Sequence, residues 1–173
     1  MEKQAKYIAY VASSIDGRIS KSSKSKVSWT SKEDWIFFQK ALNGVDAVVV
    51  GHNTYKVSEA RIKRRNAVVL TSKVSKPKVS GSVIFLNPKK SNLKKFIQGK
   101  HYKKVAIIGG PQVYSFCLDN KMLDELFVTI EPYVFNLGIP MFSGKSFKKY
   151  SFKLLSIKKL NKMGTILLQY KKV

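Results

Sequence analysis

Residues 105–114 read VAIIGGPQVY, and this stretch gives the clearest indication of the fold that we expect for the whole chain. An apolar run leads into Gly109 and Gly110, and Pro111 then opens a helical pattern. Continuously apolar runs are typical of strands covered on both faces of a parallel sheet, and proline suits the first position of a helix. Paired glycines let a diphosphate approach the backbone, where a helix N-terminus offers free N–H groups. A plain tight turn explains the same residues, because the stretch is not a G-x-G-x-x-G fingerprint.

A second buried strand with a similar ending lies at residues 47–51, which read AVVVG. It is followed by His52, Asn53 and Thr54, which stand at the start of the next helical pattern. An amide and a hydroxyl at that position either cap the helix or bind a phosphate. Two phosphate-competent helix starts in one sheet favour a dinucleotide that is held at two points.

A third strand, at residues 67–73, reads AVVLTSK and ends in Thr71, Ser72 and Lys73. Hydroxyl groups beside a cation suit a 2′-phosphate or an adenosine ribose. An ordinary loop start accounts for the same residues, so both interpretations stay open.

The whole chain, residues 1–173, is predicted to form one three-layer α/β domain. Short β-branched runs predict an eight-stranded, mostly parallel sheet, with about four helices between the strands. The last two strands flank a turn at residues 160–164 and predict an antiparallel C-terminal hairpin. The expected strands are 7–12, 47–50, 67–70, 83–86, 105–108, 126–130, 152–157 and 165–170, and the expected helices are 31–42, 53–60, 91–98 and 111–118. Residues 20–28 and 73–82 are predicted to be loops.

Residues 28–38, SWTSKEDWIFF, place two acids among aromatic side chains in a chain that is poor in acids. The Thr30–Glu33 pattern predicts a capping box that starts the helix, and Gly44 would end it. Asp34 then lies in the first turn, where an acid is often only a partner of the helix dipole. One carboxylate beside aromatic faces also suits a planar, nitrogen-rich heterocycle, whose N–H groups it would bind and whose protonation it would promote.

The formal net charge is +23, from 33 Lys and Arg against 10 Asp and Glu. Such a field attracts anions, but the lysines are spread along the chain and no nucleic-acid motif accompanies them. We therefore favour an ordinary solvated cationic surface, and the alternatives are attraction of an anionic cofactor or substrate and, behind it, binding of nucleic acid. The chain shows no secretory signal and no run long enough to span a membrane, so we expect a cytoplasmic protein. Two histidines and one cysteine predict no metal site.

In their order and spacing, these motifs resemble the dihydrofolate reductase-like superfamily over roughly residues 5–142. Residues 10–20 and 123–142 resemble the reductase domain of the riboflavin-biosynthesis deaminase–reductases. The centre is more similar to dihydrofolate reductase. That likeness rests on Trp29 followed five residues later by Asp34, and on the stretches GHNTY at 51–55, RNAVVLTS at 65–72 and IIGGPQVY at 107–114.

The resemblance implies that NADPH binds across the carboxyl ends of the strands. By position, the cofactor would contact Ala12, Ile19, His52, Asn53, Thr54, Thr71, Ser72, Gly109, Gly110, Gln112, Val113 and Tyr114. Asp34 would be the catalytic acid that holds the substrate ring, and the substrate would also contact Trp29, Phe38, Arg65 and Ile108. The resemblance places Arg65 where folate reductases bind the glutamate carboxylate of their substrate. The loop at 15–28 would close over the nicotinamide and exclude water.

Two departures from the family patterns bear on ligand specificity. His52 replaces the arginine that commonly reads the 2′-phosphate, so Lys56 or Lys73 would have to take that role. The Asp-Asp-Pro stretch typical of the riboflavin-pathway reductases is absent, and KVSEARIKRR stands in its place. The identity of the substrate therefore stays open, as does the choice between NADPH and NADH.

The expected function is an NADPH-dependent reductase that delivers hydride to a C=N-type bond of a pterin or pyrimidine metabolite. We place first the riboflavin-biosynthesis type, which resembles 5-amino-6-(5-phosphoribosylamino)uracil reductase, and dihydrofolate reductase is the alternative. A hypothesis of another class is a basic nucleic-acid-binding protein on a degenerate reductase fold. The resemblance leaves both a homodimer and a monomer open.

Overall fold

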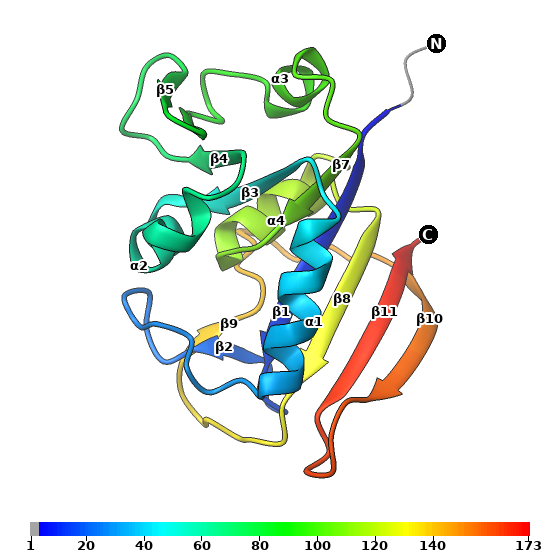
Figure 1. Cartoon of the computed structure of the whole chain (residues 1–173). Coiled ribbons are helices and arrows are strands. Elements are labelled where there is room, and N and C mark those ends of the chain that lie inside the picture. The colour runs from blue at the N-terminus through cyan, green and yellow to red at the C-terminus, as the bar shows by residue number, and fades with distance from the viewer. Residues whose placement is uncertain (1–3) are drawn as a thin grey trace.

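Nine strands form the central sheet of the computed structural model, which describes residues 4–173 (Figure 1). Their order is β10-β11-β8-β1-β7-β3-β4-β6-β5. The strands are β1 Lys6–Ser13, β3 Ala47–Gly51, β4 Ala67–Leu70, β5 Lys78–Ser80, β6 Val83–Leu86, β7 Lys104–Ile107, β8 Glu125–Ile130, β10 Phe152–Lys159 and β11 Ile166–Lys172. From β8 to β6 all neighbours are parallel, whereas β10, β11 and β5 pair antiparallel at the two edges. All eight expected strands are present, and the antiparallel C-terminal hairpin is confirmed.

The strand count differs from the prediction because the structure contains three further short strands. β5 lies inside the loop expected at 73–82, and β2 (Arg18–Ser20) pairs with β9 (Ile139–Pro140) in a separate two-stranded sheet. None of the three has a buried residue in its burial pattern. Strands this short and this exposed carry no apolar run for a sequence pattern to detect.

Four helices cover the two faces of the sheet, as expected. They are α1 Lys32–Asn43, α2 His52–Ile62, α3 Leu93–Gly99 and α4 Pro111–Asp119. α1 and α2 pack on one face through residues such as Leu42 and Tyr55, and α3 and α4 cover the other through residues such as Ile97 and Cys117. The three-layer arrangement is therefore confirmed. Within residues 4–173, no helix has the length and apolar character needed to cross a lipid bilayer.

The start of α1 lies one residue later than the capping box predicted. Ser31, not Thr30, is the N-cap, and its hydroxyl accepts a hydrogen bond from the backbone N–H of Asp34 at 3.2 Å. The expected stop is confirmed, because the Gly44 N–H bonds back to the Ala41 carbonyl. The shift places Asp34 three residues after the cap, where it is only 7% exposed.

Candidate functional site

The two glycine-marked strand ends meet at the carboxyl edge of the sheet. β3 and β7 are parallel neighbours, and the Gly51 N–H donates to the Gly109 carbonyl at 2.7 Å. The chain leaves β3 into α2 on one face and leaves β7 into α4 on the other. Adjacent strands whose connections diverge in this way define a topological switch point, the usual ligand crevice of open α/β sheets.

Both helices that begin at this crevice start without a side-chain cap. The N-caps are Gly51 for α2 and Gly110 for α4, and neither helix has a side-chain hydrogen bond at its start, whereas Ser31 and Asn92 cap α1 and α3. The alternative that Asn53 or Thr54 simply caps α2 is therefore wrong, because both lie inside the helix. Uncapped helix starts leave N–H groups available to an anionic ligand.

The glycines at this corner keep the two helix starts close together. A Cβ on Gly51 would lie 3.2 Å from Val113 Cγ2, and one on Gly110 would lie 3.3 Å from Thr54 Oγ1. Gly109 has a φ of +109°, and the Gly109–Gly110 peptide bond is cis. Side chains at these positions would occupy the space through which a ligand could reach the backbone.

His52, at the start of α2, lies beside two lysines. Its ring nitrogens are buried and have no hydrogen-bond partner among residues 4–173. Burial lowers the pKa of His52, and the nearby charges of Lys73 and Lys56 lower it further. Thr71, at the end of β4, is buried, and its hydroxyl oxygen accepts the backbone N–H of Lys73 at 3.2 Å. A neutral imidazole and two cations thus stand near the hydroxyl-bearing end of β4.

Other residues expected to contact a cofactor differ in how accessible they are. Val113 and Tyr114 are 5% and 2% exposed, and they pack against the glycine corner, formed by Gly51, Gly109 and Gly110. Gln112 and Ser72 are exposed, and Ala12 and Ile19 are half-buried in β1 and β2. Tyr114 reaches across the core, and its hydroxyl donates to the Tyr10 carbonyl at 2.6 Å.

Tyr114→Phe is therefore expected to destabilise the protein by about 1–2 kcal/mol, because a buried hydrogen bond to the β1 backbone is lost. Tyr7→Phe is the matched control, since the buried Tyr7 hydroxyl has no hydrogen-bond partner in the described part of the chain. Chemical denaturation monitored by fluorescence gives both free energies of unfolding. Equal losses in the two variants would contradict the assigned role of the Tyr114 hydroxyl.

Asp34 is a buried acid with its own hydrogen-bonded surroundings. Burial raises the pKa of Asp34, hydrogen bonds from the Thr129 and Thr30 hydroxyls lower it, and the charge of Glu131 raises it. Glu131 follows β8 and is only 1% exposed. Sequence reasoning missed Glu131, although an acid directly after the apolar strand LFVTI was a detectable signal.

The aromatic residues of the expected substrate region divide into two groups. The Trp29 ring packs edge-on against Phe135, with ring centroids 4.8 Å apart. Phe38 packs on Tyr10 with centroids 6.3 Å apart, and Ile108 is half-buried in the same cluster.

The loop that carries Phe135 is held by Asp16. The carboxylate of Asp16 accepts the N–H groups of Phe135 and Asn136 at 3.0 and 2.9 Å, and the Ser14 hydroxyl at 2.6 Å. These hydrogen bonds, led by the one from Ser14, lower the pKa of Asp16. The segment after β1 and the loop after β8 are thus fixed to one another.

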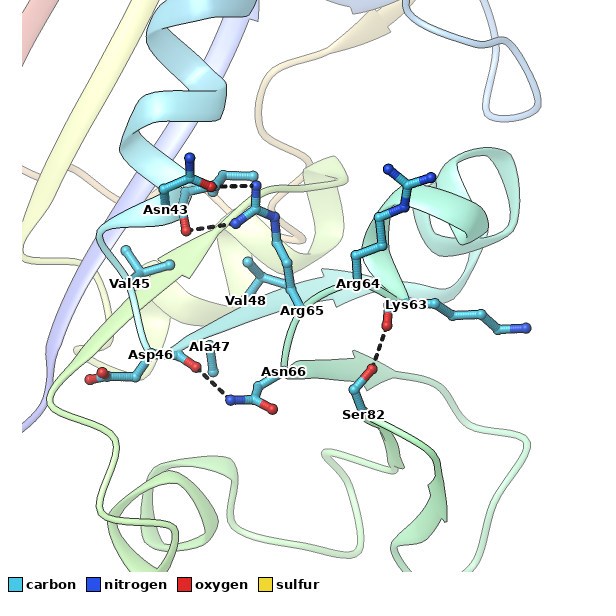
Figure 2. A pocket seen from close by; sticks show the side chains of 11 residues that line it. Asn43, Val45, Asp46, Ala47, Val48, Lys63, Arg64, Arg65, Asn66 and Ser82 are labelled. Atoms are coloured by element: carbon cyan, nitrogen blue, oxygen red, sulfur yellow. Dashed lines mark hydrogen bonds between the residues drawn. The ribbon is translucent and has the colours of Figure 1, made fainter.

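Arg65 precedes β4 at the amino edge of the sheet, and its side chain points toward Asn43 at the end of α1 (Figure 2). Its guanidinium donates to the Leu42 carbonyl at 2.9 Å and to the side chains of Asn43 and Gln39 at 3.1 and 3.3 Å. These partners lie in the last turns of α1, five to nine residues after Asp34, which corresponds to about 8–14 Å along the helix axis. A cavity of about 460 Å³ beside Arg65 opens at this amino edge.

The fold and the crevice define an α/β protein with a ligand site at the switch point between β3 and β7. The chain belongs to the dihydrofolate reductase family, whose sequence profile matches residues 8–172. A search of curated proteins finds no match.

Solved structures with the same fold come from several reductases and reductase-like proteins. A pyrimidine reductase-like protein from Corynebacterium diphtheriae is 18% identical with a TM-score of 0.80, over 99% of this chain and 93% of that one. RibD from Acinetobacter baumannii is 18% identical with a TM-score of 0.80. The match covers 99% of this chain and 59% of RibD. Dihydrofolate reductase from Enterococcus faecalis, in complex with NADP(H) and RAB-propyl, is 21% identical with a TM-score of 0.69, over 99% of both chains.

Proposed function

We propose that the protein is an NADPH-dependent reductase that transfers hydride to a C=N-type bond of a pyrimidine or pterin metabolite. The observation that carries the proposal is the pair of uncapped helix starts at Gly51 and Gly110, which lie side by side at one switch point. A diphosphate between two such starts meets N–H donors and the positive ends of two helix dipoles.

The residues at the crevice fit NADPH. A side chain at Gly51 or Gly110 would cover backbone that the glycines leave accessible, and the buried ring nitrogens of His52 have no hydrogen-bond partner among residues 4–173. Gly109, Gly110 and the first turns of α2 and α4 would hold the diphosphate. When bound, the nicotinamide supplies the hydride.

Asp34 would orient the substrate ring and promote its protonation. A carboxyl whose pKa is raised by burial keeps its proton to a higher pH than a free aspartate does, and this suits it to share a proton with a ring nitrogen. The hydroxyls of Thr129 and Thr30 lie close enough to Asp34 to lower its pKa, and they would support the carboxyl against the substrate ring. Binding the ring and the nicotinamide in contact supplies the proximity that hydride transfer needs.

For the substrate, we place a riboflavin-pathway pyrimidine first and dihydrofolate second. Arg65, the residue expected to bind the glutamate carboxylate of a folate, is already hydrogen-bonded to the end of α1. A pyrimidine substrate does not need that contact. Dihydrofolate, the second choice, is favoured by the family profile, which is that of dihydrofolate reductase and matches residues 8–172.

A direct assay follows NADPH absorbance with the purified protein and either dihydrofolate or the ribosylaminopyrimidine phosphate of the riboflavin pathway. Turnover of the pyrimidine alone supports the first choice, and turnover of dihydrofolate alone supports the second. A fluorescence titration with NADPH accompanies the assay. Failure to bind NADPH, together with no turnover of either substrate, would overturn the reductase proposal.

Lys56 and Lys73 are expected to set the preference for NADPH over NADH. Both lie close enough to His52 to lower its pKa, and Lys73 follows the end of β4, where the 2′-phosphate is expected. Replacing both with alanine should weaken NADPH binding by about 10-fold or more, since hydrogen bonds to charged groups contribute about 1.5–3 kcal/mol. NADH binding should change little. Lys76→Ala with Lys78→Ala, a change of equal charge in the next segment, is the control.

A further inference from the structure

Glu131 is a buried acid whose two oxygens are both occupied. Oε1 accepts the backbone N–H of Ser31 at 2.6 Å, and Oε2 accepts the hydroxyl of Thr165 at 2.7 Å. Thr165 itself is 0% exposed. Burying a carboxylate is costly unless hydrogen bonds compensate for the lost water, so two strong donors from distant parts of the chain indicate a built arrangement.

These contacts join three segments that are far apart in the sequence. Glu131 follows β8, Ser31 starts α1, and Thr165 precedes β11. Asn161, in the turn of the C-terminal hairpin, extends the network, because its amide donates to Thr165 Oγ1 at 2.9 Å and to Glu33 Oε2 at 3.3 Å. The hairpin turn therefore bonds directly to Glu33 in the first turn of α1, and it is linked through Glu131 to the cap residue Ser31.

The residue held by this network is the cap of the helix that carries Asp34. The Ser31 N–H is bound by Glu131, and the Ser31 hydroxyl accepts the Asp34 N–H at 3.2 Å. Thr129, whose hydroxyl lies close enough to Asp34 to lower its pKa, stands in β8 two residues before Glu131 in the sequence. The segment from Thr129 to Glu131 thus binds the cap residue of the helix that carries Asp34 and places the Thr129 hydroxyl near the Asp34 carboxyl.

We propose that Glu131 is a positioning residue for Asp34, and that the turn containing Asn161 and Thr165 forms part of the support of the site. The proposal rests on the function proposed above, in which Asp34 is the acid that contacts the substrate. It assigns a role in the site to the C-terminal hairpin, which is otherwise only the antiparallel edge of the sheet.

The charge of Glu131 has a second consequence for Asp34. Glu131 accepts the N–H of Ser31, the residue whose hydroxyl accepts the Asp34 N–H, and from this position its negative charge raises the pKa of the Asp34 carboxyl. A neighbouring negative charge disfavours the loss of the Asp34 proton. Removing that charge lowers the pKa of Asp34, whereas a purely structural role of Glu131 would leave the titration where it is.

Glu131→Gln tests this consequence with little change in shape. The glutamine oxygen can still accept the Ser31 N–H, and its amide can donate to Thr165 Oγ1. We expect the midpoint of the Asp34 titration, measured by carbon NMR of the labelled carboxyl, to move to lower pH. The acidic limb of kcat/KM should move in the same direction. An unchanged midpoint in the folded variant would overturn the electrostatic part of the proposal.

Glu125→Gln is the matched control for the charge. Glu125 lies at the other end of β8 and pairs with Lys6 at 2.6 Å. The control removes one acid from the same strand and should leave the Asp34 titration unchanged. A shift as large as that of Glu131→Gln would mean that net charge, not proximity, moves the midpoint.

Thr165→Val and Thr165→Ser test the positioning. Valine removes the hydroxyl that Glu131 binds, and we expect kcat/KM to fall on the order of 10-fold, as for one hydrogen bond to a carboxylate, with NADPH binding unchanged. Serine keeps the hydroxyl and should restore the rate. Wild-type rates in both variants would overturn the positioning role. If the wild-type protein reduces neither substrate, the proposed function fails, while the NMR titration still decides whether Glu131 acts on Asp34.

Discussion

Replacing Asp34 with asparagine is expected to lower kcat for the proposed reduction by about 100- to 10,000-fold, the range that a positioned acid or base contributes. Asparagine is of nearly the same size and can still accept the Thr129 and Thr30 hydroxyls, but it cannot share a proton with the substrate ring. NADPH binding should be unchanged, because the cofactor is held at the glycine corner. Steady-state kinetics and a fluorescence titration measure the two effects separately.

The same variant should be more stable than the wild type at neutral pH. Because the folded-state pKa of Asp34 is raised, the native protein binds this proton more tightly than the unfolded chain does. Stability is therefore lost as pH rises above the ordinary aspartate pKa. Asparagine has no proton to lose, so the melting temperature of Asp34→Asn should exceed that of the wild type above that pH, and the two should converge in acid.

Asp46→Asn is the control for both effects. Asp46 is exposed, and its carboxylate binds the N–H groups of Lys103 and Lys104 at 2.7 and 2.8 Å, at the amino edge of the sheet. It should retain wild-type kcat. Full activity in Asp34→Asn would remove the acid from the mechanism. Salt-sensitive polynucleotide binding by both the wild type and Asp34→Asn, without NADPH binding, would instead favour the nucleic-acid-binding hypothesis.

The strands that position the site were predictable because they are buried on both faces. Residues 47–50 and 67–70 are continuously apolar, and the structure buries all of them. The crevice was predictable in outline for the same reason, since such strands are parallel and their carboxyl ends share one edge. The short strands β2, β5 and β9 have too few residues and too much exposure to leave a pattern.

The support of the acid could not be read from the sequence. Glu131 meets Ser31 across 100 positions and Thr165 across 34, and no local periodicity encodes contacts of that range. The cap was misplaced by one residue because Thr30 and Ser31 are both good caps. Whether Glu33 or Asp34 lies three residues after the cap then depends on that choice, and only the fold decides it.

The engagement of Arg65 illustrates a different limit. The resemblance assigns this residue to substrate binding, but a motif does not show how many donors remain free. In the structure the guanidinium bonds to the final turn of α1 (Figure 2). Its first role is thus to join the end of α1 to the segment before β4, and its assignment to the substrate stays a prediction.

Gly110→Ala is expected to weaken NADPH binding by about 10- to 100-fold, as for the loss of one hydrogen bond to a phosphate. Gly110 has a φ of −82°, so alanine adopts the backbone without the strain that Gly109, with a φ of +109°, would impose. A loss of NADPH affinity in Gly110→Ala therefore reports on the space that the new side chain occupies, and not on backbone strain. The new Cβ would lie 3.3 Å from Thr54 Oγ1, between the starts of α2 and α4.

Gly99→Ala separates this loss of space from the general effect of replacing a glycine. Gly99 ends α3, and a Cβ there would meet no atom within 4 Å in residues 4–173. Because alanine is favoured over glycine in a helix, the control should bind NADPH as the wild type does and be at least as stable. If Gly110→Ala also binds NADPH normally, the diphosphate does not lie between the two helix starts. The helix-dipole argument for the cofactor would then fail, even if Asp34 proved essential.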